Sequence, residues 1–592
     1  MELPIKKALD RLYVAPLKFF ARTLGLRKKL KRKGELVDAL ANEMEMNLEG
    51  VWRALIQTEQ RVVAEVAHNG GSYDPAVHKA KYAEACPIHE PESWSTEASL
   101  VWLFCSLEVG RYIMPQPLVD RIKALAPKPC APAMSTLEGI PDEISNRRIG
   151  TRTVHIHLGN DFSLMEMGSV LSLIKSAPIK VNVRTLRPIA YAEQRLADAL
   201  IDFDFSLKVL RQADSQVSLG QTPGMIRPHA WGVLVQQCGW CKPAGETLQL
   251  TNRGTTMLSE KNMEEFRRGV RRFIENDEFD ELDRINGLEG PSHYGKRFLR
   301  RPSERRRAIR RSMTSWPQDT WIAFEEVFRF LTASDSGFSA YQESYRSSLG
   351  LGPDKETFYS GEYIDRLFLR VFLFESLGTM GLVDLGYVHP ARLWPDVKPD
   401  PRDHGKSFFS SYDGLLFIRL NSLGSYCLDL SEDYEHRLNR LKGLFRVLPN
   451  HEILLEKQED LPATARYMLT SIGKPVSDFV WRLDTDMFLK HLESGGRMTD
   501  VVDFLESHGS DKLPENVRAH LDDVGRKAAL VIDSEEAIIV EMADEHVARE
   551  IAGNRRTKKF CKLNAGRFVV VSKRDLRTFR NALRKLGYVL PC

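Results

Sequence analysis

The sequence predicts a mainly α-helical protein with small β-hairpins, an α+β fold divided among several domains. Three observations support this prediction. The chain has 592 residues, more than one hydrophobic core usually holds. Most apolar residues recur at the spacing of amphipathic helices. Short alternating stretches such as TRTVHIHLG, and Gly-containing turns between apolar runs, indicate strands and hairpins.

Charge and composition narrow the class of protein. The net charge is +4, with 43% hydrophobic and 28% charged residues, as in ordinary globular proteins. Any basic surface must therefore come from local patches. The eight cysteines are sparse, which favours reduced thiols, and MELPIKKALDRLYVAPLKFF lacks the features of a signal peptide. No apolar run is long enough to span a bilayer, so we expect a cytoplasmic protein without a membrane partner.

Residues 1–127 read as a helical region. Apolar residues mark one helix face before a basic break and another face after it, at Leu17, Phe20, Ala21 and Leu24 and then at Leu36, Val37 and Leu40. This order resembles small helix-extended-helix modules that contact nucleic-acid backbones. An ordinary helical hairpin with a solvated loop fits the order as well. A Pro-rich linker at 128–150 follows.

Residues 151–260 predict a first DNA-binding module. A strand, TRTVHIHLG, precedes a helix that Asn160 or Asp161 would cap. A helix in LADALIDFDFSLKVLRQA, a polar stretch, a second helix around WGVLVQQ and a hairpin starting in CGWCKPAGE then follow. This is the order of winged-helix domains, in which the helix before the hairpin usually enters the DNA major groove. Arg227, at the start of that helix, is therefore a candidate DNA contact.

Residues 301–458 predict a second winged-helix region, after a charged connector at 261–300. LTNRGTTML (Leu250–Leu258) and LNSLGSYCL (Leu420–Leu428) share the pattern Leu-x3-Gly-x3-Leu, and each follows a short apolar strand. A helix and a Gly-containing turn precede each strand at some distance. We interpret this as an internal repeat of architecture, although nine residues are few enough for chance similarity. A long loop, 387–414, would sit in or before the second hairpin.

The most unusual stretch is KRFLRRPSERRRAIRRSM. Its first sixteen residues hold eight arginines, one lysine and one acid. The planar guanidinium fork donates two hydrogen bonds to phosphate oxygens, which makes arginine well suited to a nucleic-acid backbone. The candidate contacts are Lys296, Arg297, Arg300, Arg301, Arg305, Arg306, Arg307, Arg310 and Arg311, together with Arg227.

Three interpretations of the arginine run stay open: contact with nucleic acid, pairing with an acidic protein, and a solvated helix face. The acidic block ENDEFDELD, Glu275–Asp283, lies shortly upstream and holds six acids, so the two segments could also neutralise each other. We expect incomplete cancellation, because the run carries a net charge of +8 and one strip of acids cannot reach its whole circumference. Further basic clusters are Arg27 to Lys33, the four arginines Arg267, Arg268, Arg271 and Arg272, and Arg555 to Lys559.

Residues 459–592 shift to mixed α and β character. We expect three helices in MFLKHLESGGRMTDVVDFLESHGSDKLPENVRAHLDDVGR, two short strands in AALVIDSEEAIIVEMAD, and a strand and a helix in GRFVVVSKRDLRTFRNALRKLGYVL. The residue order of this region resembles the accessory domain attached to bacterial XPB-type helicases, at Gly496, Phe504, Leu505, Glu506, His508, Leu513, Pro514, Asn516 and Val517. The closing VVVSKRDLRTFRNALRKLGY is similar to the end of that domain. The earlier segment from KRFLRRPSERRRAIRRSM to LNSLGSYCL resembles large bacterial proteins that carry the same domain. The resemblance covers about half of the chain and implies a nucleic-acid-associated protein rich in winged helices.

The helicase motor is missing from this pattern. GPSHYGKR is the nearest approach to a phosphate loop, but Arg297 stands where Ser or Thr would hold Mg²⁺, and no buried strand precedes it. Cys238 and Cys241 form a CxxC pair that we interpret as a turn, with zinc and redox chemistry as alternatives. We therefore expect no catalytic residue, no cofactor and no metal.

Together these patterns predict a non-catalytic DNA-binding protein. It would hold the DNA backbone, duplex in preference to single strand, and act beside a separate helicase or nuclease. Bacterial defence against foreign DNA is one setting that the resemblance suggests. The alternative is a protein-interaction scaffold whose winged-helix modules dock other proteins and make no direct contact with DNA.

Overall fold

The structure is a computed structural model of the chain. It describes residues 4–590 except 27–29, 85, 87–90, 92–96, 109, 148, 160–162, 201–204, 206–224, 261, 286–287, 290–298, 335, 341–349, 352–360, 391–392, 394–409, 435–442, 457–460, 462, 494–495 and 530–536. Lys296, Arg297, the expected cap at Asn160 or Asp161, most of the helix expected at 196–213 and much of the loop at 387–414 lie outside the described residues.

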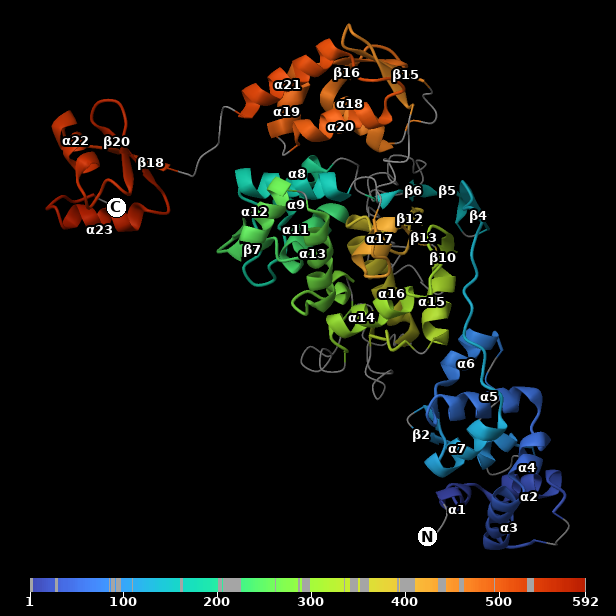
Figure 1. Cartoon of the computed structure of the whole chain (residues 1–592). Coiled ribbons are helices and arrows are strands. Elements are labelled where there is room, and N and C mark those ends of the chain that lie inside the picture. Colours follow the sequence, from blue (N-terminus) through green and yellow to red (C-terminus); the bar gives the residue numbers. More distant parts are fainter. Residues whose placement is uncertain are drawn as a thin grey trace. The chain divides into compact units, whose positions relative to one another are not determined.

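The chain divides into two compact units, Met1–Leu513 and Pro514–Cys592. Helices dominate both units, and the strands form small antiparallel sheets (Figure 1). The predicted mixture of helices and small β-hairpins is therefore confirmed. Among the described helices, none combines the length and the apolar composition that crossing a bilayer requires.

The N-terminal region has its own hydrophobic core. Helices α2 (Val14–Thr23) and α3 (Lys33–Met46) bury the two faces that the sequence predicts. The Glu35 carboxylate accepts hydrogen bonds from the backbone N–H groups of Lys31 and Arg32, which fixes the start of α3. The core continues over α5 (Gln57–His68), α7 (Gln116–Leu125) and a three-stranded sheet of β1 (Ser72–Tyr73), β3 (Arg111–Ile113) and β2 (Ser106–Glu108).

A four-stranded antiparallel sheet organises the centre of the larger unit. Its order is β10 (Trp321–Ala323), β13 (Leu415–Leu420), β12 (Val383–Tyr387) and β6 (His155–His157). Leu385 lies opposite Ile418 on one side and His157 on the other. Because β6 comes from the first predicted winged-helix region and the other strands from the second, residues 151–260 and 301–458 share one sheet and one hydrophobic core.

The predicted connector at 261–300 also belongs to this core. Its helix α13 (Met263–Glu275) buries Phe266, Val270 and Phe273 among residues of both regions. The sequence suggested a charged connector because charged residues outnumber apolar ones there. The apolar residues nevertheless recur every three or four positions, which is the spacing of a buried helix face.

The predicted internal repeat is visible as local geometry that occurs twice. In the first copy, helix α11 leads through Gly239 into a hairpin and a closing helix; these elements are α11 (Arg227–Gln237), β7 (Cys241–Ala244), β8 (Thr247–Leu250) and α12 (Asn252–Glu260). In the second, α16 (Gly361–Val371) and the π-helical turn η7 (Phe372–Leu377) lead through Gly381 into β12, β13 and α17 (Ser422–Cys427). The two turn glycines have φ of +74° and +72°, which L residues rarely adopt.

Both copies begin and pack the closing helix in the same way. The Thr251 hydroxyl accepts a hydrogen bond from Gly254 N–H at 3.1 Å, and the Asn421 side chain accepts one from Gly424 N–H at 2.9 Å. A Cβ added to either glycine would lie 2.0 Å or 1.9 Å from the carbonyl oxygen that precedes the first strand of its copy. The shared Leu-x3-Gly-x3-Leu pattern therefore corresponds to one packing arrangement used twice.

The last part of the larger unit contains a second four-stranded antiparallel sheet. Its strands run in the order β14 (Phe445–Val447), β15 (Glu452–Leu455), β17 (Val480–Leu483) and β16 (Gly473–Pro475), accompanied by α18 (Ala463–Ile472), α19 (Thr485–Glu493) and α20 (Met498–His508). Since β15 pairs with β17, the predicted boundary between residues 458 and 459 falls inside this sheet. Helices α19 and α20 lie where the sequence predicts them.

The smaller unit begins with α21 (Glu515–Ala529) and continues as a two-layer structure. Its sheet has the order β18 (Ala537–Glu541), β20 (Phe568–Ser572) and β19 (Cys561–Leu563). Helices α22 (Glu545–Gly553) and α23 (Leu576–Arg584) pack on one face of it, around Val540, Val569, Val571, Ile551 and Phe579. The sequence predicts β18, β20 and α23 but misses α22 and β19.

The close approach at Gly424 gives a test of the repeated packing. We expect Gly424→Ala to destabilise the protein by roughly 1–3 kcal/mol, because the added methyl group collides with a backbone carbonyl that cannot rotate away. Thermal unfolding measures the change. Gly139→Ala is the matched control, since a Cβ there meets no atom within 4 Å, and equal melting temperatures for the two variants would contradict the packing argument.

Candidate nucleic-acid interface

The arginine run forms helix α14 (Pro302–Met313), which starts against the acidic block Glu275–Asp283. Pro302 occupies the first turn, where its missing N–H group leaves no hydrogen bond unmade. Ser303 N–H donates to the Asp277 carboxylate at 2.9 Å. Burial opposes ionisation of Asp277, but the hydrogen bonds from Ser303 outweigh it and lower the pKa of this carboxyl group. The acidic block therefore supplies the N-terminal anion that favours a helix in this place.

Arg305 and Arg306 point into the protein and not toward solvent. Their side chains are 0% and 1% exposed, and they form ion pairs of 2.6 Å with Asp280 and Glu281 of the acidic block. The other N–H groups of Arg306 donate to three backbone carbonyls, those of Phe273, Asn276 and Phe279. The guanidinium groups of both arginines also lie over phenylalanine rings. Neither side chain has exposed surface to offer a phosphate.

The Asp429 carboxylate binds three more arginines, which come from helices α13 and α14. This residue follows α17 in the left-handed conformation, with φ of 62°. Its carboxylate accepts hydrogen bonds from Arg267 Nε at 2.8 Å, Arg271 Nε at 3.0 Å and Arg310 Nη2 at 2.6 Å. Burial disfavours the charged carboxylate, but the hydrogen bonds from Arg271 and Arg267 outweigh it and lower the pKa of Asp429. Arg310 is thereby held within the fold.

The other predicted contacts of this run lie in different surroundings. Arg301, Arg307 and Arg311 are exposed, and Arg307 lies 3.5 Å from Glu275. Arg300 donates to the Gly337 carbonyl at 2.7 Å. The structure thus places Arg305, Arg306, Arg307, Arg310 and Arg311 on one helix, with Arg300 and Arg301 just before it, but directs only part of them outward. DNA contact by the exposed three stays a prediction.

Arg227 is buried at the start of α11. It pairs with Glu166 of α8 (Ser163–Ser176), and its guanidinium group lies 5.3 Å from the centre of the Phe205 ring. Nine of the eleven residues of α11 are buried, because neighbouring helices pack on several sides of it. Helix α11 therefore has no exposed face that could lie in a DNA groove, where the sequence predicts it.

The CxxC pair lies where a helix gives way to a hairpin. Cys238 caps the end of α11 and Cys241 opens β7. Burial raises the pKa of both thiols, that of Cys241 to about 12, whereas reactive thiols have a lowered pKa. Within the described residues, no three His, Cys, Asp or Glu side chains gather as a metal site requires. The interpretation as a turn fits this geometry.

The smaller unit holds a long basic segment, of which the sequence interpretation named only Arg555 to Lys559. Residues 553–585 hold one acid, Asp575, and twelve basic residues, which are Arg555, Arg556, Lys558, Lys559, Lys562, Arg567, Lys573, Arg574, Arg577, Arg580, Arg584 and Lys585. All of these basic residues are exposed except Arg580, which is half-buried. We call this set the C-terminal basic surface. Counting charge in a window of about thirty residues would have found it, whereas the search for adjacent arginines did not.

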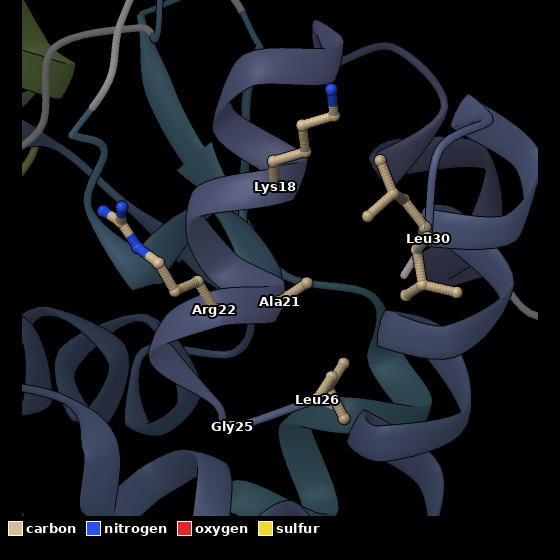
Figure 2. A pocket seen from close by; sticks show the side chains of 7 residues that line it. Lys18, Ala21, Arg22, Gly25, Leu26 and Leu30 are labelled. Carbon is tan, nitrogen blue, oxygen red and sulfur yellow. The ribbon is translucent and has the colours of Figure 1, made fainter. Parts of the chain in front are cut away.

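A second basic region lies at the N-terminus. Residues 11–34 contain nine basic residues and no acid. Between α2 and α3 is a pocket of about 370 Å³ with an apolar lining that includes Ala21, Leu26 and Leu30. Figure 2 shows Lys18 and Arg22 one turn apart on α2, with the two leucines across the pocket from this helix. The site combines apolar surface with two exposed cations.

The buried pairing of α14 can be tested by removing one carboxylate. Glu281→Gln leaves the Arg306 charge without its anion at 1% exposure, so we expect a loss of about 3 kcal/mol in the free energy of unfolding. Urea denaturation followed by tryptophan fluorescence measures it. Glu278→Gln removes an exposed acid of the same block and is expected to change stability by less than about 0.5 kcal/mol. Similar losses in both variants would show that the block acts only through its total charge.

Asp429 predicts a dependence of stability on acid pH. Its pKa lies below the ordinary 3.8 in the folded protein, so the stabilisation is complete above that value and is lost as pH falls through the folded pKa. We expect the melting temperature of the parent to fall below about pH 4 more steeply than that of Asp429→Asn, which starts lower at neutral pH. Parallel curves for the two proteins between pH 2 and about pH 5 would contradict this assignment.

Comparison with known proteins adds no family to this description. No protein-family model matches the chain, and no curated protein matches it. The resemblance to the accessory domain of XPB-type helicases therefore stays a prediction that rests on the sequence alone.

Proposed function

We propose that the protein binds nucleic acid, DNA above all, through phosphate contacts on its C-terminal basic surface, and that it has no catalytic centre of its own. The observation that carries this proposal is the charge imbalance of residues 553–585, with twelve basic residues against one acid. Eleven of the twelve are exposed. Basic side chains presented in this density by a folded unit suit a polyanion better than a single acidic side chain.

The attraction would come chiefly from the release of counterions. Each phosphate that a basic side chain neutralises contributes about 0.9 to the slope of log affinity against log salt concentration. Binding through several residues of the C-terminal basic surface would therefore weaken steeply as salt rises and depend little on base sequence. The compact core beneath the surface, around Val569 and Phe579, holds the charges in fixed positions, which reduces the entropy lost on binding.

The larger unit has a supporting role in this proposal. Its two helix–hairpin–helix copies would be winged-helix modules that have merged into one core, and on α14 only Arg301, Arg307 and Arg311 would reach DNA. Action beside a separate helicase or nuclease is supported by the resemblance of residues 459–592 to the helicase accessory domain. The buried ion pairs of α14 favour a structural role for the rest of the arginine run.

The N-terminal pocket favours a second candidate function, protein docking. Its apolar lining and its two cations, Lys18 and Arg22, suit a peptide that carries both acidic and apolar side chains. This pocket belongs to the region whose order resembles a helix-extended-helix module. As a docking site it would make the chain a scaffold that brings an acidic partner to the complex.

Fluorescence anisotropy with a labelled 20-base-pair DNA duplex across a salt series tests the proposed function. We expect tight, salt-dependent binding by the parent. Replacing Arg555, Lys558, Lys559 and Lys562 with Gln removes four exposed charges, so the salt slope should fall by about 3 and the affinity by at least about 100-fold.

The matched control changes Arg446, Lys474, Arg482 and Lys490 to Gln. These residues are also exposed and their loss lowers the net charge equally, but they lie in the larger unit and form ion pairs. We expect this control to bind as the parent does. If the parent binds no nucleic acid even at low salt, the proposed function fails and docking through the N-terminal pocket becomes the better explanation.

A further inference from the structure

Helix α23 has one face in the core and one face covered with polar groups. Phe579, Ala582 and Leu583 are buried in the core of the smaller unit. On the opposite side, Arg577, Asn581 and Arg584 are exposed at intervals of four and three residues. This spacing places them in one stripe along the helix. The stripe is the most regular part of the C-terminal basic surface.

Asn581 is the neutral residue at the middle of this stripe. Its side-chain amide, which carries both donors and an acceptor, makes no hydrogen bond to the described part of the chain. Arg577 precedes it by one turn and Arg584 follows it by about one turn. A surface that only bound phosphate would gain nothing from a central amide, whereas a surface that also reads bases needs such a group.

We propose that α23 lies in the major groove of duplex DNA, where Asn581 reads an adenine while Arg577 and Arg584 hold the flanking phosphates. This inference rests on the proposed function and adds the form of nucleic acid, the groove and the base-reading residue. The major groove is about 12 Å wide, which admits an α-helix of about 10–12 Å with its side chains. An asparagine amide can pair with both N6 and N7 of adenine.

The chemistry of the stripe favours duplex DNA over the other nucleic acids. The major groove of an RNA duplex is deep and narrow, so a helix cannot reach its bases. Single strands are usually held by aromatic rings on which the bases stack, and the exposed stripe of α23 carries none.

The acids nearest in the fold are engaged elsewhere. On α22, which packs on the same face of the sheet, Glu545 pairs with Arg549, and Glu550 accepts a hydrogen bond from the Tyr588 hydroxyl at 3.0 Å. Asp575, at the start of α23, lies 3.9 Å from Arg574. These interactions limit the repulsion that a phosphate backbone would meet beside α23.

The test measures binding of the whole chain to a 20-base-pair DNA duplex and to the RNA duplex of the same sequence. We expect DNA to bind at least about tenfold more tightly than RNA. The double variant Arg577→Gln, Arg584→Gln should lose this preference, with DNA binding weakened at least tenfold and the salt slope lowered by about 2. The control pair Arg526→Gln, Lys527→Gln changes two exposed cations of the same unit that are both ion-paired with Asp523, and should leave the preference intact.

Asn581→Ala addresses the base reading separately. We expect the parent to enrich adenine at a fixed position when it selects from a pool of DNA duplexes with randomised central base pairs. The variant should lose this enrichment and keep the salt slope of the parent, because it removes no charge. Thermal unfolding should show both α23 variants to be as stable as the parent, since the three residues are exposed.

Each failure has a distinct meaning. Equal affinity for the DNA and RNA duplexes, with a steep salt slope, would overturn the groove inference and leave the proposed function standing. Adenine enrichment that persists in Asn581→Ala would overturn the reading role. If neither duplex binds at low salt, both the inference and the proposed function fail.

Discussion

The pairing of α14 with carboxylates of the acidic block and of Asp429 is the interaction on which the larger unit depends. The acidic block anchors the start of the helix, Asp280 and Glu281 neutralise its buried arginines, and Asp429 holds its outer end. Burying a charged group costs free energy unless the group is paired and hydrogen-bonded. Here Arg306 reaches one carboxylate and three carbonyls, so the cation also ties the end of α13 to α14.

Sequence reasoning succeeded where apolar periodicity decides the structure. It placed the hairpin after α11, the strand before α17 and helices α19 and α20, because each has a clear pattern of buried residues. It named the acidic block as a possible partner of the arginine run, and Asp280 and Glu281 do pair with Arg305 and Arg306. It could not locate Asp429, which lies more than a hundred residues further along the chain from Arg310. The net charge of a segment does not reveal which of its side chains face inward. For a related reason the sequence did not reveal that residues 151–260 and 301–458 share a sheet, because strand β6 pairs with a strand from a distant segment.

The candidate interface also shows that the sequence does not reveal which charged side chains are exposed. The sequence predicts the arginine run as a contact surface because its cations are adjacent. Adjacent residues of a helix face different sides, so Arg305 and Arg306 point into the core. The C-terminal basic surface has its cations spread over loops, strand β19 and helix α23, where all of them except the half-buried Arg580 are exposed. A folded unit can present such charges only if few of them need partners inside. Its small apolar core meets that condition, since no arginine among the described residues of this unit is buried.

The carboxylate of Asp429 also carries a consequence for how this chain can evolve. One residue in a left-handed conformation, which favours Asn, Asp and Gly, serves three arginines from two helices. A substitution of Asp429 leaves three neighbouring cations without their shared carboxylate. The loss of any one arginine leaves the hydrogen bonds of the other two to Asp429 in place. Drift should therefore proceed through the arginines first, and descendants that keep fewer of them are the ones in which position 429 becomes free to vary.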